Sequence, residues 1–215
     1  MAREDEFLDA AKRGDGPAVA DFLRTQPELV CVADEYQKTA LHWAAEKNHA
    51  DIARLLLDAG ADIEATTSWG ATPLEWAATM GSSSVADLLL ARGAGRFTLI
   101  VAAALGKFED VKSMAGSERE AVSTALYAAA RNGHTEVVAY LLDQGATIDT
   151  RGFFGGTGLH WAAINGHRDT VELLIARGAS RSLRDEHFDS TPQEWAIEGG
   201  HRELAALLHI YTTNE

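Results

Sequence analysis

Apolar residues recur at helical spacing in several short segments of this chain, and each segment is followed by glycine. The clearest examples are residues 52–57, 85–90, 137–142 and 171–175. Leucine, isoleucine and valine fall on one side of each predicted helix, so that one face packs inward. The glycines that follow are Gly60, Gly93, Gly145 and Gly178. Because glycine readily adopts the left-handed conformation that ends a helix, the pattern predicts short amphipathic helices with defined C-termini.

A second kind of helix is predicted by a motif that returns along the chain. Thr-Ala-Leu-His-Trp-Ala-Ala begins at Thr39, Thr-Pro-Leu-Glu-Trp-Ala-Ala at Thr72, and Thr-Gly-Leu-His-Trp-Ala-Ala at Thr157. A weaker copy begins at Thr191. Threonine caps a helix N-terminus, and proline is well suited to the first helical position. Alanine favours helix and is small enough to permit close stacking, so the motif predicts the first helix of a repeated pair.

The spacing of these copies predicts a stack of seven helix pairs. The recurrent leucine or its substitute is found at Phe7, Leu41, Leu74, Leu99, Leu126, Leu159 and Gln193. A period near 33 residues is typical of repeat proteins, in which each repeat buries its apolar face against its neighbours. We therefore expect one domain over residues 1–215, with polar caps at both ends. Its repeats are approximately 3–33, 34–66, 67–95, 96–116, 117–149, 150–184 and 185–215.

The combination of T-P-L-H-x-A-A, then G-H, then an apolar helix ending in L-L-x-x-G-A resembles the ankyrin repeat family over about residues 5–210. The resemblance implies an all-α repeat solenoid of antiparallel helix pairs with β-hairpin fingers between them. It also implies that partners bind at the finger tips and on the concave surface of the inner helices. In similar repeats the histidine at the position of His42 and His160 ties the fingers together by hydrogen bonds.

Aromatic residues stand three positions before the recurrent threonine. They are Tyr36, Trp69, Phe154 and Phe188, and Phe153 precedes Phe154. The family resemblance places them at finger tips, where exposed aromatic rings are typical of interface hot spots. The alternative is that each ring packs sideways on the next finger.

The repeat that contains Leu99 is flanked by shortened intervals of 25 and 27 residues. These intervals predict that two fingers are mostly missing and leave a notch in the finger row. Met80, Leu105 and Ile164 occupy positions that face the concave side in ankyrin-like proteins, so we expect an apolar floor beneath the notch. The alternative is that the short repeat fills the gap with its own side chains.

Tryptophan precedes the alanine pair, or its equivalent, at Trp43, Trp76, Trp161 and Trp195. Such regular placement favours core packing between helices over stacking on a ligand. A buried indole N–H needs a hydrogen-bond acceptor.

Catalysis has little support in this sequence. Glu75, His160 and Glu194 replace one another at one position of the repeat, and burial beside tryptophan would raise a carboxylate pKa for acid–base chemistry. However, one position on successive repeats places side chains too far apart for a nucleophile to touch its base. No zinc-binding or cofactor-binding motif is present, so we expect no metal and no cofactor.

Composition limits the classes of partner and compartment. The net charge of −13 opposes binding to nucleic acid and to anionic membranes. No apolar run approaches the roughly 18 residues of a membrane span, and the N-terminus lacks the apolar segment of a signal peptide. Cys31 is the single cysteine, which favours a reducing compartment, and we expect a cytoplasmic protein.

These observations predict a protein-binding module, acting as an adaptor or inhibitor through its finger-tip aromatic rings and concave surface. Its acidity predicts a partner with basic residues around an apolar anchor. The alternative is a small-molecule-binding protein or enzyme with a pocket at the shortened central repeat. Oligomeric state does not follow from the sequence.

Overall fold

A computed structural model describes residues 2–152 and 155–212. Phe153 and Phe154 lie outside the described residues. The chain divides into two compact parts, an N-terminal half (Met1–Phe97) and a C-terminal half (Thr98–Glu215), and each is described by itself. None of the helices in the described residues is long and apolar enough to cross a membrane.

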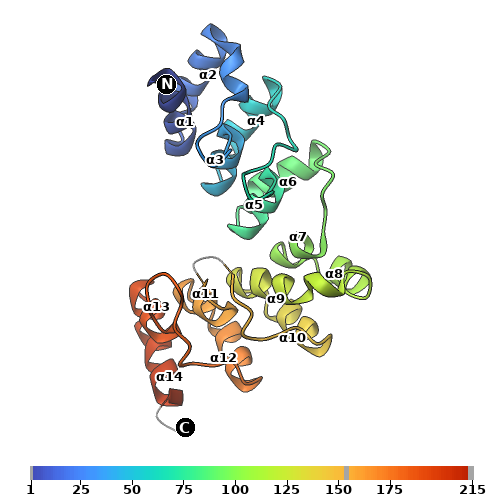
Figure 1. Cartoon of the computed structure of the whole chain (residues 1–215), viewed down its shortest axis with the longest axis vertical. Coiled ribbons are helices and arrows are strands. Elements are labelled where there is room, and N and C mark those ends of the chain that lie inside the picture. The colour runs from blue at the N-terminus through green and yellow to red at the C-terminus, as the bar shows by residue number, and fades with distance from the viewer. Residues whose placement is uncertain (1, 153–154, 213–215) are drawn as a thin grey trace. The chain divides into compact units, whose positions relative to one another are not determined.

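The N-terminal half contains three helix pairs. Its helices are α1 (Ala2–Arg13), α2 (Gly16–Thr25), the 3-10 helix η1 (Pro27–Cys31), α3 (Ala40–Glu46), α4 (Ala50–Asp58), α5 (Pro73–Thr79) and α6 (Ser83–Ala91). The first helices of the pairs, α1, α3 and α5, pack against one another in a row (Figure 1). The second helices, α2, α4 and α6, form another row beside them.

Within its described residues, the C-terminal half repeats this arrangement with four pairs. Its helices are α7 (Leu99–Ala104), α8 (Phe108–Met114), the 3-10 helix η2 (Arg119–Ala121), α9 (Val122–Arg131), α10 (Thr135–Asp143), α11 (Gly158–Ile164), α12 (Arg168–Ala176), α13 (Pro192–Glu198) and α14 (Arg202–Thr212). The first helices of its pairs are α7, α9, α11 and α13, and they pack in a row. We call the first helices of the pairs in both halves the inner helices. The all-α repeat architecture expected from the sequence is confirmed.

Four inner helices, α3, α5, α11 and α13, begin at capping boxes. In α5 the Thr72 side chain accepts a hydrogen bond from the Glu75 backbone N–H, and the Glu75 carboxylate accepts one from the Thr72 backbone N–H at 2.9 Å. In α11 His160 takes the place of the carboxylate, and its Nδ1 accepts from the Thr157 N–H at 3.1 Å. Glutamate and histidine therefore have the same role at this position. Each accepts a hydrogen bond from the backbone N–H of the capping threonine.

The histidine version of the cap also reaches the next finger. Because Nδ1 of His42 accepts from the Thr39 N–H, its Nε2 carries the proton and donates to the Ala71 carbonyl oxygen at 3.1 Å. Nε2 of His160 likewise donates to the Ser190 carbonyl oxygen at 3.1 Å. These bonds tie consecutive fingers together, as the family resemblance implies.

Two of the fingers are closed by isolated antiparallel bridges, at Ala33 with Thr39 and at Arg151 with Thr157. The described residues contain no longer β-ladder, so the expected hairpins are reduced to single bridges. The two shortened intervals contain no such bridge within the described residues: residues 92–98 join α6 to α7, and residues 115–121 include η2. The boundary between the two halves falls in the first of these intervals.

We expect the free energy of unfolding to fall as the pH is lowered from about 7.5 to about 5.5. Burial lowers the pKa of His42 and His160 below the ordinary value of 6.5, although the carbonyls of Ala71 and Ser190 act in the opposite direction. The unfolded chain then binds more protons than the folded chain. The stability contributed by these neutral rings is present above about pH 6.5 and is lost as the pH falls below it.

The His160→Gln variant should show a smaller loss of stability over this range, because glutamine keeps an acceptor for the Thr157 N–H but does not titrate. The measurement is the thermal unfolding midpoint at several pH values. His209→Gln, at an exposed position, is the matched control and should keep the wild-type pH dependence. Equal slopes for the two variants would contradict the assignment.

Candidate functional site

An aromatic cluster lies on two consecutive fingers of the N-terminal half. The ring centroids of Tyr36 and Trp69 are 6.3 Å apart, and those of Trp69 and Trp76 are 5.6 Å apart. Tyr36 is 53% exposed and Trp69 is 48% exposed, whereas Trp76 is buried. The sequence left open whether these rings are exposed at the tips or pack on the next finger. Tyr36 and Trp69 do both, because the two rings are in contact and each is about half exposed.

Backbone hydrogen bonds fix the positions of these tips. One carboxylate oxygen of Asp34 accepts from the N–H groups of Tyr36 and Lys38, each at 2.9 Å. The Ser68 N–H donates to the Tyr36 carbonyl oxygen at 2.9 Å and links the two fingers. A tip that is already ordered loses less conformational entropy when a partner binds.

A lysine is enclosed beneath the tips. Lys38 Nζ lies 4.1 Å from the ring centroid of Trp43 and 4.5 Å from that of Trp76. It also contacts Glu46 Oε2 at 2.9 Å, and the Trp76 indole N–H donates to the same oxygen at 3.3 Å. Burial raises the Glu46 pKa, but Lys38 and Lys47 outweigh this effect and hold it below the ordinary value. Cation–π contacts and an ion pair together fix the two indoles.

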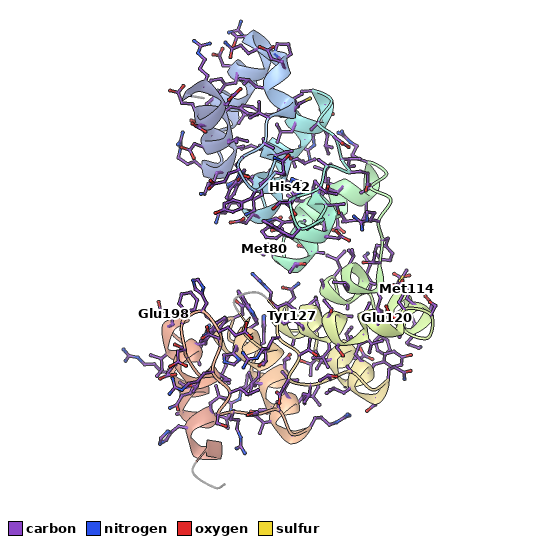
Figure 2. The ribbon with its side chains drawn as sticks, viewed as in Figure 1. His42, Met80, Met114, Glu120, Tyr127 and Glu198 are labelled. Carbon is purple, nitrogen blue, oxygen red and sulfur yellow. The ribbon has the colours of Figure 1, made fainter. Side chains whose placement is uncertain are left out.

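A cavity of about 590 Å³ lies in the C-terminal half, on α11, α13 and the finger between them. It is lined by Trp161, Ile164, Phe188, Ser190, Glu194, Trp195 and Glu198. We call it the C-terminal cavity. Phe188 is 60% exposed at the tip of its finger, and Glu198 is the last residue of α13 (Figure 2). The ring centroids of Trp161 and Trp195 are 5.1 Å apart, at an interplanar angle of 82°.

Asp185 organises the finger beside this cavity. Its Oδ1 accepts from the N–H groups of His187 and Phe188, at 2.9 and 2.6 Å. Its Oδ2 accepts from the Ser190 N–H at 3.0 Å and from the Trp195 indole N–H at 2.9 Å. Burial raises the Asp185 pKa, but these donors, led by the Phe188 N–H, outweigh it and lower the pKa to about 2. The Asp185 carboxylate is therefore charged, and its hydrogen bonds fix the backbone of Phe188 and the indole of Trp195.

The residues considered for acid–base chemistry are engaged in helix capping. The Glu194 carboxylate accepts from the backbone N–H and hydroxyl of Thr191, and these bonds lower its pKa below the ordinary value. The expectation of a raised carboxylate pKa is therefore wrong for Glu194, because hydrogen bonding outweighs burial. Glu75 and His160 serve in capping boxes of the same kind.

The remaining predicted site residues are distributed between the two halves. Met80 belongs to the N-terminal half, and Leu105 and Ile164 belong to the C-terminal half; all three are partly buried. Ile164 lines the C-terminal cavity. An apolar floor shared by the three residues stays a prediction. Within the described residues, no group of three or more His, Cys, Asp or Glu side chains is placed to hold a metal ion.

Two organising residues were missed by sequence reasoning, Lys38 and Asp185. Asp185 had a sequence signal, because an aspartate precedes the recurrent threonine by five residues at Asp34 and by six at Asp185. Lys38 had none, since a lysine beside a finger tip reads as an exposed charge until the indoles around it are placed.

Comparison with known proteins identifies the repeats. The family profile for ankyrin repeats (3 copies) matches residues 7–97, 99–185 and 149–214. The chain is 32% identical over 147 residues to the transient receptor potential cation channel subfamily A member 1 homolog of Caenorhabditis elegans, covering 66% of this chain and 10% of that protein.

Two kinases are also similar to parts of the chain. The serine/threonine-protein kinase VIK of Arabidopsis thaliana is 34% identical over 73 residues, which cover 34% of this chain and 17% of the kinase. Diacylglycerol kinase iota of Homo sapiens is 46% identical over 66 residues, which cover 30% of this chain and 6% of the kinase. The chain thus matches only a small share of each relative.

We expect Asp185→Asn to destabilise the C-terminal half by about 2 kcal/mol, because an amide NH₂ would face N–H donors that the carboxylate now accepts. The measurement is urea unfolding followed by tryptophan fluorescence and circular dichroism. Asp189→Asn is the matched control: its side chain is 86% exposed, and we expect a change within about 0.5 kcal/mol. Equal effects of the two substitutions would refute the role of Asp185.

Proposed function

This chain belongs to the ankyrin repeat family, and on that premise we propose that it holds a partner protein through its finger-tip aromatic rings and inner helices, as an adaptor or inhibitor. Ankyrin repeats generally mediate protein–protein interaction and are typically non-catalytic. Fold alone does not specify a partner, so the proposal rests on particular side chains.

The observation that carries the proposal is the Tyr36 and Trp69 pair. Two large rings in contact are each about half exposed, on tips that are fixed by hydrogen bonds to Asp34 and between fingers. Tyrosine and tryptophan are the residue types most enriched in interface hot spots. Phe188, on a separate finger, supports the same function in the C-terminal half.

The charge of the chain supports a basic partner. With a net charge of −13, the surface attracts cationic proteins and repels phosphate backbones and anionic membranes. We therefore propose a protein partner with basic residues around an apolar anchor, and neither nucleic acid nor membrane. The exposed, free Cys31 is consistent with the reducing environment of the cytoplasm, where we place this activity.

A second candidate function is small-molecule binding, favoured by the C-terminal cavity. Its volume of about 590 Å³ lies within the range of ligand pockets, roughly 300–1,000 Å³, and three of its seven lining residues are aromatic. Catalysis at this cavity has less support, since Glu194 and His160 are held by capping hydrogen bonds.

The test is capture of partners from native cell extract on immobilised wild-type protein and on the Tyr36→Ala/Trp69→Ala double variant. For a captured protein, we expect the double variant to bind at least about 30-fold more weakly, because truncating a hot-spot ring costs roughly 2 kcal/mol or more.

Leu55→Ala is the control, since Leu55 is an exposed apolar residue on α4, in the second row of helices. It should bind as the wild type does. Recovery of the same proteins with equal affinity by wild type and double variant would refute the proposal.

A further inference from the structure

We propose that the C-terminal cavity receives a lysine side chain of the partner, with its ammonium group beside Trp195 and Glu198. The inference rests on the proposed function and specifies the chemistry of the partner. It comes from comparing this cavity with the equivalent positions of the N-terminal half, where the same constellation is already filled by a lysine of the chain itself.

The filled site consists of Trp43, Lys38 and Glu46. Lys38 precedes the tryptophan by five residues and Glu46 follows it by three. The Lys38 ammonium lies 4.1 Å from the Trp43 ring centroid and 2.9 Å from the Glu46 carboxylate. It also lies 4.5 Å from the ring centroid of Trp76 in the next repeat. This site shows which chemistry the arrangement accepts, namely an ammonium group between an indole face and a carboxylate.

The last repeat has the same spacing without the lysine. Glu198 follows Trp195 by three residues, and the residue five positions before Trp195 is Ser190. All three line the C-terminal cavity. Serine is too short to reach the carboxylate from the position that Lys38 occupies in its own repeat. The tryptophan and the glutamate are therefore present, and a cavity of about 590 Å³ adjoins them in place of the long side chain.

The neighbouring repeat supplies no lysine either. The residue five positions before Trp161 is Gly156, and a Cβ atom there would lie 3.0 Å from Trp195 Cη2 and 3.3 Å from Trp161 Nε1. The glycine lets the two indoles approach to 5.1 Å. Because they are so close, we place the incoming ammonium in the adjoining cavity and not between the two rings.

The charges around the cavity favour a cation. Glu194 and Glu198 both line it. Two cations lie nearby: Arg184 Nη1 is 3.6 Å from Glu194 Oε2, and the Arg131 guanidinium is 3.7 Å from the ring centroid of Trp161. Glu198 is exposed and has no ion-pair partner among the described residues. An anion would face both carboxylates, whereas a lysine would place its charge at Glu198.

The apolar walls fit the rest of a lysine side chain. Ile164 and Phe188 line the cavity beside the tryptophans and would cover the methylene groups, as apolar surfaces do for lysine stems elsewhere. Stacking of cations on tryptophan is already frequent in this chain: Lys12 lies 4.4 Å from the Trp43 centroid, and the Arg131 guanidinium lies 3.7 Å from the Trp161 centroid.

The experiment titrates the full chain with N-acetyl-lysine methylamide and with its uncharged analogue, N-acetyl-norleucine methylamide. The readout is the NMR shift of the indole N–H groups of Trp161 and Trp195. We expect saturable shifts with the lysine compound at millimolar concentration and much smaller shifts with the norleucine compound. Equal shifts with both compounds, or none with either, would overturn the proposal.

Three variants locate the response. Glu198→Gln should weaken binding of the lysine compound by about two- to five-fold, whereas Glu136→Gln, at an exposed position on α10, should leave it unchanged. Ser190→Lys should abolish the response by supplying an internal lysine. Unchanged binding in both Glu198→Gln and Ser190→Lys would place the lysine compound elsewhere and overturn the proposal.

The N-terminal half provides the converse test. Lys38→Ser, which introduces the residue found at the equivalent position of the last repeat, should empty the site between Trp43 and Trp76 and create a second set of indole shifts upon titration. A protein that shows no lysine response, but still loses its partner upon substitution of Tyr36 and Trp69, would overturn this inference and leave the proposed function standing.

Discussion

Four of the inner helices, α3, α5, α11 and α13, depend on one local interaction, the hydrogen bond from the N–H of a threonine to the side chain three residues later. Where that side chain is histidine, the second ring nitrogen donates to the carbonyl of the next finger, so that a single ring starts a helix and sets the position of a tip. The histidine bond to the next finger therefore helps to position the aromatic ring at the tip of that finger.

The two halves differ in what lies between the tryptophans of consecutive repeats. Between Trp43 and Trp76 the space is filled by the Lys38 ammonium and the Glu46 carboxylate. Between Trp161 and Trp195 the rings contact each other directly, and Asp185 receives the indole N–H of the second ring. In the N-terminal half Lys38 neutralises the Glu46 carboxylate. In the C-terminal half the equivalent carboxylate, Glu198, lines a cavity.

Sequence patterns predicted the architecture because repetition reveals which positions are equivalent. The paired helices and the threonines that cap four of the inner helices follow from the spacing. The site was less predictable. Enclosure of Lys38 depends on two indoles from consecutive repeats, and the low pKa of Asp185 depends on four donors from its own finger and the following helix. Such effects arise from three-dimensional proximity, which residue type alone does not encode. The pKa of Glu194 illustrates the limit, since burial and hydrogen bonding act in opposite directions.

The short connection that joins α6 to α7 has a consequence for how substitutions are tolerated. In a repeat array, stabilising free energy passes only between adjacent repeats. The boundary between the compact parts lies within this connection. A substitution that loosens one helix pair is therefore expected to weaken first the pairs stacked directly on it within the same part.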